Sequence, residues 1–481
     1  MSRLVRLVLS TFALSAAIAP FVHAEDPPSS WVDKDTGHRV IRLTSEPGSS
    51  AFYFNVNGYT PDGKEMIYTA PDGIHVLTLA SRKTRLLVPN PPRPAVANSS
   101  DPVARLRNGV HTIVVGRKTP SVFFSKMEAG EKAGDFAASV YSANINTGEV
   151  KKLVMLPDGA SVTTVNADET LAAGTMNDGP AVAPPYGANL PQGARRGGAP
   201  DPTAGAHVQP EGKGAMMERR LASRQPLILF TINLQTGKMT TLLHSTDWVN
   251  HLLFSPVDPE LLMYCHEGPW HKVDRIWMIH TDGTHNTLVH KRTMAAEIAG
   301  HEFWGLDGKT IWYDWQYPRG EDFFLASYNL ETHRRVAYHM QRNDWSIHFN
   351  LTQDLDLFTG DGGDPGQVAK APDGEWIELF HPELISYPGA LNEPDFWQPG
   401  VFHPEHLVNM SHHNYRLEPN VRFTPGKSMV IFTSNMFGPS YVFGVEVAKA
   451  VSPKASEVLS TPELGAKFNP VKPEPTSNSD K

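Results

Sequence analysis

Three histidines recur at the same distance before a turn in the second half of this 481-residue chain. His251, His301 and His348 each lie four residues before a turn that leads into an apolar strand. Equivalent positions in a repeat protein occupy equivalent places in space, so we expect the three imidazoles to converge on one site. Imidazole binds divalent metals and titrates near neutral pH, which also suits a general base. The alternative is three unrelated histidines that pack against the wall of a central channel.

The last repeat offers further metal ligands. Asn420 has the same offset from its turn, and Glu418 lies two residues before it, so both side chains point to one face of their strand. Imidazole, carboxylate and amide oxygen together suit a divalent cation such as manganese. Cys265 is the only cysteine, so no thiolate cluster competes. His413, slightly upstream, is a possible fifth ligand.

Substrate-binding groups are predicted beside this site. Residues 265–271 place two histidines, an acid and an aromatic side chain around a Gly-Pro turn, although the same residues could be structural. The candidates in this turn are His266, Glu267 and His271. Arg275 and Arg220 are candidates to clamp a substrate carboxylate with two parallel hydrogen bonds.

The scaffold that positions these residues is predicted to be a β-propeller. Turn-plus-strand units begin near residues 60, 108, 166, 255, 306, 352 and 424. In the turn at residues 61–64, proline presets φ and glycine supplies a positive φ, and alternating apolar residues follow. Four short strands per unit without sustained helical periodicity indicate an all-β, seven-bladed β-propeller. Six or eight blades are alternatives, because the second unit is faint.

The N-terminus is typical of a cleaved secretory signal. Two arginines precede the apolar run Leu7–Ile18, and Ala24 provides a small residue at a cleavage point. Pro20 and His23 interrupt the apolar run, which makes it too short for a membrane anchor. We therefore expect an exported, periplasmic or secreted protein that has no membrane contact after the signal is cleaved.

Composition divides the chain after residue 24 into a folded domain and a C-terminal tail. Residues 25–465 are assigned to the propeller, with a flexible Gly/Pro/Ala-rich insertion at 176–217, and residues 466–481 to a disordered tail. The formal net charge of −8 argues against a nucleic-acid partner. The oligomeric state is left open.

Three segments resemble a known enzyme family. Residues 264–269 (Tyr-Cys-His-Glu-Gly-Pro), 300–304 (Gly-His-Glu-Phe-Trp) and 423–434 are similar to segments of the oligogalacturonate lyases, polysaccharide lyase family 22. The resemblance runs from about residue 35 to 450. It implies a seven-bladed propeller that cleaves a uronate sugar by β-elimination, with manganese as cofactor. By position, His251 matches the family's base and His301 a metal ligand.

The chain departs from this family at the metal site. Residues 418–420 read Glu-Pro-Asn where the family has His-Pro-His, and Tyr415 stands in place of a glutamine ligand. The family's catalytic arginine falls near Ile228, with Arg220 and Arg224 close by. Tyr415 is therefore assigned to substrate binding, and the metal to His301, His348, Glu418, Asn420 and His413.

The resulting hypothesis is a lyase acting on short uronate oligosaccharides with Mn²⁺ or another divalent cation. Two alternatives share the scaffold. One is a glycoside hydrolase, or a lyase for another uronate. The other is a propeller that only binds a partner, since the turn repeats alone do not establish catalysis.

Overall fold

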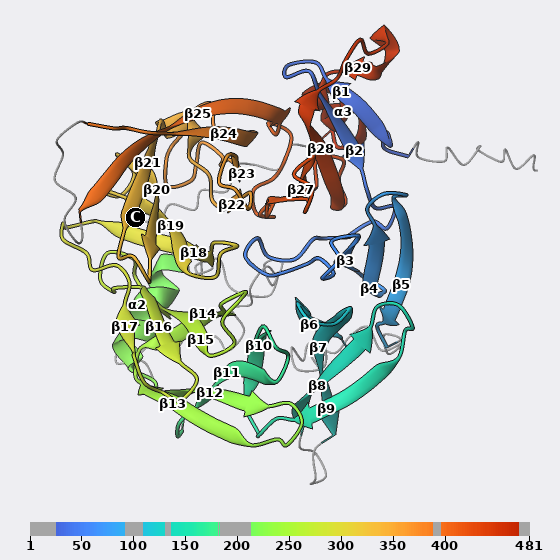
Figure 1. Cartoon of the computed structure of the whole chain (residues 1–481). Coiled ribbons are helices and arrows are strands. Elements are labelled where there is room, and N and C mark those ends of the chain that lie inside the picture. Colours follow the sequence, from blue (N-terminus) through green and yellow to red (C-terminus); the bar gives the residue numbers. More distant parts are fainter. Residues whose placement is uncertain are drawn as a thin grey trace, which may run out of the picture.

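The computed structural model describes residues 26–91, 109–129, 136–180, 182, 213–387 and 396–470. Within these ranges the chain is mostly β-structure, with two short α-helices, α2 (Lys213–Ser223) and α3 (Thr461–Phe468). The strands form sheets that surround a common centre, as in a propeller (Figure 1). The predicted all-β, propeller-type fold is therefore confirmed.

The first three sheets follow the chain in simple order. Neighbouring strands along the sequence pair antiparallel within each of these sheets. They comprise β3 (Glu65–Ala70), β4 (Gly73–Thr78) and β5 (Lys83–Pro89); β6 (His111–Val115), β7 (Ser121–Ala129), β8 (Phe136–Asn144) and β9 (Val150–Met155); and β10 (Ser161–Val165), β11 (Leu171–Asn177), β12 (Leu227–Asn233) and β13 (Met239–Ser245).

The next two sheets carry the predicted histidines. One contains β14 (Trp248–Phe254), β15 (Leu261–Glu267), β16 (Ile276–His280) and β17 (Thr287–Leu288). The other has eight strands, because parallel pairing of β21 with β25 joins two groups of four. Its strands are β18 (Ile298–Trp304), β19 (Thr310–Gln316), β20 (Phe323–Asn329), β21 (Arg335–Met340), β22 (Phe349–Leu351), β23 (Phe358–Gly360), β24 (Trp376–Leu384) and β25 (Trp397–Asn409).

The last sheet joins the two ends of the described chain. Strand β2 (His38–Arg42) pairs antiparallel with β28 (Tyr441–Lys449), so an early strand closes the sheet formed by the final ones. The other members are β1 (Ser30–Asp33), β26 (Arg422–Phe423), β27 (Met429–Ser434) and β29 (Val458–Leu459). Closure of this kind fixes the ring without a disulfide, in line with the single, buried cysteine.

The turns explain why the strands begin where they do. In the first repeat, the Thr60 hydroxyl donates to Asp62 Oδ1 over 2.7 Å, and Gly63 has φ of 67°. In a later repeat, Asp307 Oδ1 accepts two backbone N–H groups and Gly308 has φ of 68°. Glycine adopts this left-handed backbone without the steric cost of a side chain.

The predicted domain boundaries meet the structure only in part. The predicted signal, residues 1–24, lies outside the described residues. The segment 176–217 begins within β11 and ends within α2, and its middle, residues 181 and 183–212, is not described. The predicted tail start at residue 466 falls inside α3, so the helix continues past that boundary.

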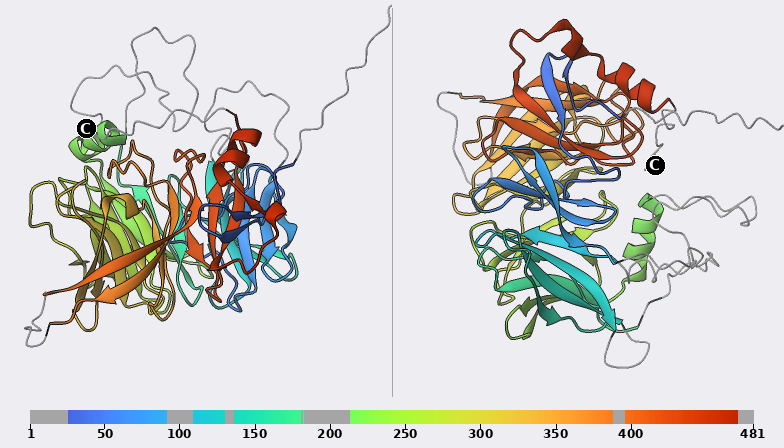
Figure 2. Two further views of the ribbon diagram at one scale, coloured as in Figure 1. Left: turned by 90° about the horizontal axis from the view of Figure 1, so that it is seen from above. Right: turned by 90° about the vertical axis from the view of Figure 1, so that its right-hand side faces the viewer.

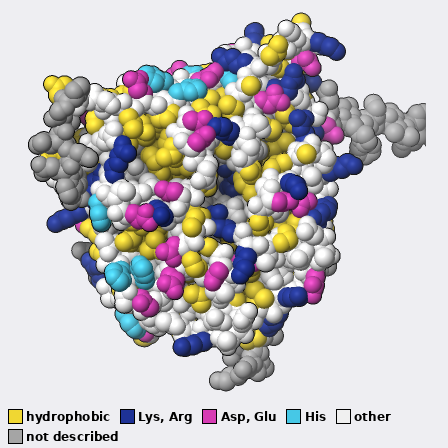
Figure 3. Space-filling view, viewed as in Figure 1, with side chains coloured by type: hydrophobic (Ala, Val, Ile, Leu, Met, Phe, Trp, Pro, Cys, Tyr) yellow, Lys and Arg dark blue, Asp and Glu magenta, His cyan; other side chains and the backbone are white. Residues whose placement is uncertain are grey.

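Both helices lie on one side of the ring, which is hereafter called the α2 face (Figure 2). Side chains of both charge signs are interspersed on the opposite face (Figure 3). In the described parts of the chain, no helix combines the length and apolar character that crossing a membrane requires.

One buried carboxyl group in this fold has no hydrogen bond and only a histidine beside it. Glu378 on β24 is fully buried, neither of its oxygens has a hydrogen-bond partner, and His406 Nε2 lies 3.3 Å from Oε1. Burial raises the pKa of this carboxyl well above its usual value, and Asp344 and Asp373 raise it further. The unfolded chain releases this proton at lower pH than the folded protein. The free energy of unfolding must therefore fall as pH rises from about 4.5 toward the folded-state pKa.

Glu378→Gln is expected to remove this loss, because a neutral amide replaces the carboxyl at nearly the same size. The variant should be more stable than the wild type at about pH 8 and similar to it at about pH 4. Urea unfolding at both pH values measures the difference. Glu383→Gln, an exposed position on the same strand, is the matched control. Parallel pH profiles for the Glu378 variant and the wild type would contradict the expectation.

Candidate functional site

The backbone holds two of the predicted histidines in the same unusual conformation. His251 and His301 have φ of 48° and 50°, and the pairing register of β14 and β18 shifts at these two positions. Asn420, at the same offset in the last sheet, has φ of 57°. A positive φ is uncommon outside glycine, and a β-bulge of this kind redirects a side chain. The shared offset in the sequence therefore reflects a shared bulge. His348 has the same offset without this backbone conformation.

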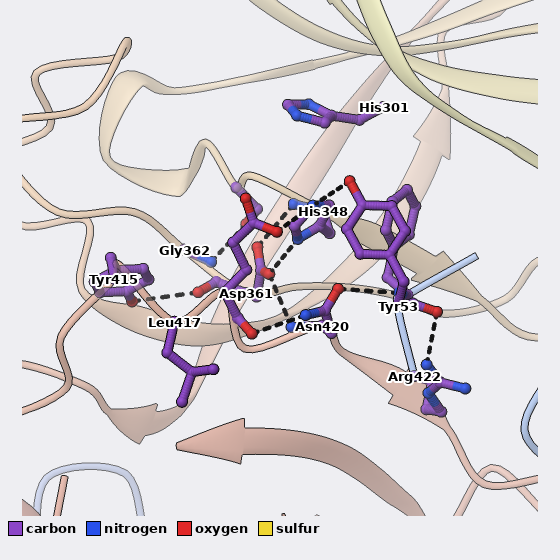
Figure 4. Close-up of polar contacts among 12 residues, drawn as sticks. Tyr53, His301, His348, Asp361, Gly362, Tyr415, Leu417, Asn420 and Arg422 are labelled. Atoms are coloured by element: carbon purple, nitrogen blue, oxygen red, sulfur yellow. Dashed lines mark hydrogen bonds and ion pairs between the residues drawn. The ribbon is translucent and has the colours of Figure 1, made fainter. Parts of the chain in front are cut away.

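The three histidines gather around one tyrosine at the centre of the ring. The rings of His301 and His348 are 5.2 Å apart between centroids. The Tyr53 ring lies 5.0 Å from that of His348 and 6.0 Å from that of His251. This group is called the histidine cluster below: His251, His301, His348 and Tyr53 (Figure 4 shows the last three). The expected convergence is thus present in the structure.

Each histidine has a buried carboxylate beside it. Carboxylates placed behind imidazole rings fix the ring orientation and raise the basicity of the opposite nitrogen, as they do for metal ligands and general bases. The three pairs are His251 Nε2 to Glu267 Oε2 at 3.0 Å, His301 Nδ1 to Asp314 Oδ2 at 3.6 Å, and His348 Nδ1 to Asp361 Oδ2 at 2.8 Å.

Asp314 has a strongly perturbed carboxyl. Burial raises its pKa to about 7, although hydrogen bonds from Gln316 and Trp345 act in the opposite direction. Gln316 Nε2 donates to it over 3.1 Å and Trp345 Nε1 over 3.3 Å. These donors hold the carboxyl against His301 and leave Nε2 of that ring on the side of the cluster.

Tyr53 was not predicted as a site residue. Its hydroxyl lies 3.1 Å from His348 Nε2, and because His348 Nδ1 donates to Asp361, this nitrogen accepts from the tyrosine. Burial raises the pKa of Tyr53 well above its usual value, and Glu418 is the next largest cause. The hydroxyl is therefore neutral and can donate near neutral pH. The repeat pattern gave no signal for Tyr53, which lies in the segment before β3.

A buried arginine positions this tyrosine. Arg422 on β26 donates to the carbonyl oxygens of Phe52 and Tyr53, the latter over 2.9 Å, and to that of Val56 over 3.0 Å. The cation thereby satisfies backbone groups of the segment that enters the centre of the ring (Figures 1 and 4). The segment is held by the last sheet although it lies about 370 residues earlier in the chain.

Glu267, predicted to bind substrate, instead contacts both His251 and Arg275. One oxygen contacts His251 Nε2 at 3.0 Å, and the other lies 3.3 Å from Arg275 Nη1. Both Glu267 and Arg275 are buried. Burial alone would lower the pKa of Arg275, but Cys265 and the two nearby carboxylates raise it above its usual value. Glu267 therefore orients His251 and is not itself open to a substrate.

The prediction that Arg275 clamps a substrate carboxylate is wrong for the same reason. Its guanidinium lies 4.4 Å from the Trp270 ring and is enclosed with Glu267, away from the open side of His251. Arg220 is exposed on α2, where its guanidinium lies 3.6 Å from the centroid of the Trp248 ring. Arg220 therefore lies at the rim, outside the histidine cluster.

His251, Cys265 and Glu267 also place potential metal ligands within 4.8 Å of one another. Two observations make this group unsuitable for a cation. The Arg275 guanidinium already contacts Glu267, and it lies 3.6 Å from Cys265 Sγ. Burial raises the pKa of the Cys265 thiol well above its usual value, so the thiolate that binds metals does not form readily.

Two predicted metal ligands are occupied by structural hydrogen bonds. Asn420 Oδ1 accepts from the Phe54 backbone N–H over 3.0 Å, and its Nδ2 donates to the Glu418 carbonyl over 2.8 Å. His413 is buried, with Nδ1 3.0 Å from Ser434 Oγ and Nε2 2.7 Å from the Leu417 carbonyl. The assignment of Asn420 and His413 to a metal is therefore wrong.

The remaining substrate-binding predictions also need correction. Tyr415 is buried, and its hydroxyl donates to the Asp361 carbonyl over 3.2 Å, so it supports the carboxylate behind His348. His266 packs edge-on against Tyr264 and Trp277, on the opposite face of β15 from Glu267. His271 is exposed, and its Nε2 lies 4.0 Å from Glu218 on α2.

Glu418 is the predicted ligand that remains available. Its side chain is 45% exposed, and Oε2 lies 3.8 Å from His348 Nε2. Together with His301 Nε2 and His348 Nε2 it offers one carboxylate and two imidazole nitrogens around the cluster. This is a donor set that suits a first-row divalent cation. The carboxylates behind both histidines fit the same interpretation.

Comparison with known proteins finds similarity over the second half of the chain. Residues 223–451 match the family model of oligogalacturonate lyase. The resemblance predicted from residues 264–269, 300–304 and 423–434 is thereby confirmed over this range. An oligogalacturonate lyase of Dickeya dadantii (strain 3937) is 27% identical over 235 residues, and an oligogalacturonide lyase of Pectobacterium atrosepticum is 27% identical over 238.

These alignments include 46% of this chain and 56% of each relative, so the chain spans little more than half the length of the curated relatives it matches.

Solved structures are similar in fold over a larger part of the chain. An oligogalacturonate lyase in complex with manganese superposes with a TM-score of 0.62 at 19% identity, over 87% of this chain and 96% of that one. An oligogalacturonate lyase from Vibrio parahaemolyticus gives 0.60 at 18% identity, with the same coverage.

Proposed function

We propose that this protein is an oligogalacturonate lyase that cleaves short uronate oligosaccharides by β-elimination. The observation that carries the proposal is the His251–Glu267 pair inside the histidine cluster. It lies in the range that matches the oligogalacturonate lyase family and joins an imidazole to a buried carboxylate at 3.0 Å.

His251 is assigned as the general base. Its Nε2–H donates to Glu267, so the lone pair on Nδ1 takes the proton from C5 of the uronate. The electrons of the C5–H bond form the C4–C5 double bond, the C4–O bond breaks, and the leaving oxygen takes up a proton. Glu267 stabilises the imidazolium that results, and Arg275 contacts the other oxygen of this carboxylate.

A divalent cation such as Mn²⁺ is part of the proposal. His301, His348 and Glu418 would hold it. When bound, it would neutralise the substrate carboxylate as negative charge develops next to C5. The solved oligogalacturonate lyase in complex with manganese supports this choice of metal. The Tyr53 hydroxyl donates to the same His348 nitrogen that would bind the cation, so this hydroxyl would turn away when the cation is held, while Asp361 keeps the ring in place.

Chelation should therefore inactivate the enzyme. Treatment with EDTA is expected to lower the turnover rate on the order of 10²-fold or more, and added Mn²⁺ should restore it. Titration calorimetry of Mn²⁺ into His301→Ala supplies a readout that does not depend on activity. This variant should lose metal binding, and His266→Ala, a histidine outside the cluster, should retain it. Full activity after chelation would overturn the role of the metal.

Product masses test the reaction class. A lyase releases one fragment with an unsaturated end, lighter by one water than the fragment that hydrolysis would give. We expect this unsaturated fragment from oligogalacturonate incubated with the manganese-loaded protein. Fragments carrying the mass of an added water would assign the protein to the glycoside hydrolases, and intact substrate would favour a binding propeller.

Two structural features belong to the same proposal. Seven blades result if the eight-stranded sheet counts as two, β18–β21 and β22–β25, beside the other five sheets. Export rests on the signal-like pattern of residues 1–24.

A further inference from the structure

Trp270, in the turn at residues 265–271, borders the histidine cluster without a role in the proposed mechanism. Its side chain is partly exposed, and its ring centroid lies 4.9 Å from that of His301 in an edge-to-face contact. His301 is one of the proposed cation ligands, so the indole borders the place where the reacting sugar would lie. An aromatic side chain with one polar group in this position is a candidate to contact the sugar.

Two backbone hydrogen bonds hold the loop that carries Trp270. The His266 N–H donates to the Arg275 carbonyl over 2.9 Å and closes the loop at its base. The Lys272 N–H donates to the Pro269 carbonyl over 2.8 Å and forms the turn around the tryptophan. The indole is therefore presented from a fixed backbone, which a substrate-binding group requires.

The six-membered ring of the indole is inserted over Gly300. A Cβ atom at this glycine would lie 2.8 Å from Cζ3 and 3.0 Å from Cη2 of Trp270, and 3.3 Å from Arg275 Nε. Gly300 directly precedes His301 on β18, so the small residue there lets the ring approach the cluster. The Arg275 guanidinium lies 4.4 Å from the centroid of the Trp270 ring. Packing against these three residues fixes the orientation of the indole.

The N–H group of Trp270 lies on the opposite edge of the indole. Cζ3 and Cη2 belong to the six-membered ring over Gly300, whereas Nε1 belongs to the five-membered ring. Within the described part of the chain this N–H has no acceptor, and it is not enclosed. The indole N–H groups of Trp277 and Trp304, by contrast, donate to backbone carbonyls over 2.8 and 3.0 Å. An indole N–H is a donor only, so the ligand group that it selects is an acceptor.

The proposed substrate calls for a donor at this position. Each uronate unit carries a carboxylate, and β-elimination develops further negative charge beside it. Neither predicted arginine supplies a hydrogen bond there, since Arg275 is enclosed with Glu267 and Arg220 lies outside the cluster. The Trp270 N–H is a neutral donor beside His301, and a carboxylate oxygen only accepts.

We propose that the indole N–H of Trp270 binds a carboxylate oxygen of the uronate unit held at the histidine cluster. The assignment rests on the function proposed above. It makes Trp270 a substrate-binding residue that orients the carboxylate and thereby turns C5 toward His251. Trp270 takes no part in moving the proton.

Binding measured in the His251→Ala background separates this contact from turnover. Isothermal titration calorimetry of galacturonate trimer into the manganese-loaded protein is compared for this background alone and with Trp270→Phe added. Phenylalanine keeps an aromatic ring over Gly300 and removes only the N–H donor. We expect the affinity for the trimer to fall by about 10- to 100-fold, the loss of a hydrogen bond to a charged group. Trp277→Phe, whose N–H donates to the Asp274 carbonyl, is the matched control and should not change it.

Titration of Mn²⁺ into the same variants distinguishes a substrate contact from support of His301. Trp270→Phe should bind the cation as tightly as the background does. An unchanged affinity for the trimer would overturn the contact, and so would a loss matched by an equal loss of Mn²⁺ affinity. If the wild type releases no unsaturated product but the loss of trimer affinity persists, the contact stands and the proposed reaction falls. Absence of trimer binding to the wild type would overturn both.

Discussion

His251→Ala is expected to lower the turnover number for oligogalacturonate by about 10²–10⁴-fold, the range typical of a removed general base. The side chain is partly exposed toward the cluster and lies 3.0 Å from Glu267, so its loss removes the proton acceptor while the fold remains. Metal binding should also be retained, since the proposed ligands lie outside β14. Initial rates at saturating substrate measure the effect.

His266→Ala provides the matched control for this experiment. His266 lies on β15 close to His251 in the sequence, but it packs against Tyr264 and Trp277 away from the cluster. Its removal should leave the rate within a few-fold of the wild type. A His251→Ala protein that binds Mn²⁺ and retains the full rate would remove His251 from the mechanism.

Glu267→Ala should have a large effect on both stability and activity. The substitution leaves the buried Arg275 without its ion-pair partner, and breaking a buried pair in this way costs about 3–5 kcal/mol of unfolding free energy. Glu302 is buried nearby and favours the arginine electrostatically, which places the expected loss near the lower end, about 3 kcal/mol. The rate should also fall, because His251 loses the group that orients it.

Urea unfolding monitored by tryptophan fluorescence measures the change in unfolding free energy. Initial rates at low temperature measure the change in activity. Glu260→Ala is the control, since this residue is exposed and directly precedes the same strand. An unchanged unfolding free energy for Glu267→Ala would show that burial of Arg275 does not require its ion pair with Glu267. An unchanged rate would show that His251 does not need Glu267 to orient its ring.

Local sequence signals predicted the scaffold because its determinants are local. Gly63 and Gly308 mark turns that only a left-handed backbone can make, and the strands follow directly from them. The offset from these turns also predicted the convergence of His251, His301 and His348, since a repeat carries equivalent residues to equivalent places.

The pairs that give the site its chemistry were not visible in the same way. Asp314 and Asp361 lie 13 residues after the histidines they contact, Asp314 on the neighbouring strand and Asp361 directly after it, and only strand pairing brings them together. Tyr53 reaches the cluster from the opposite end of the chain, held there by Arg422.

The errors have a common physical origin. Side chains of a metal-binding type were assigned to the metal from their sequence positions alone. In the folded protein these side chains instead form hydrogen bonds with backbone groups. The amide of Asn420 satisfies the Phe54 N–H at a bulge, and His413 caps the Leu417 carbonyl in the interior. Arg275 was expected to meet a substrate, but Glu267 on the adjacent strand neutralises it.

The most direct measurement is ultraviolet absorbance during incubation of the manganese-loaded wild type with oligogalacturonate. Proton abstraction at C5 followed by loss of the C4 oxygen conjugates the new double bond with the carboxylate. Absorbance is therefore predicted to rise with time, and to stay flat with His251→Ala. A flat trace for the wild type, with substrate bound or hydrolysed, would contradict β-elimination by this protein.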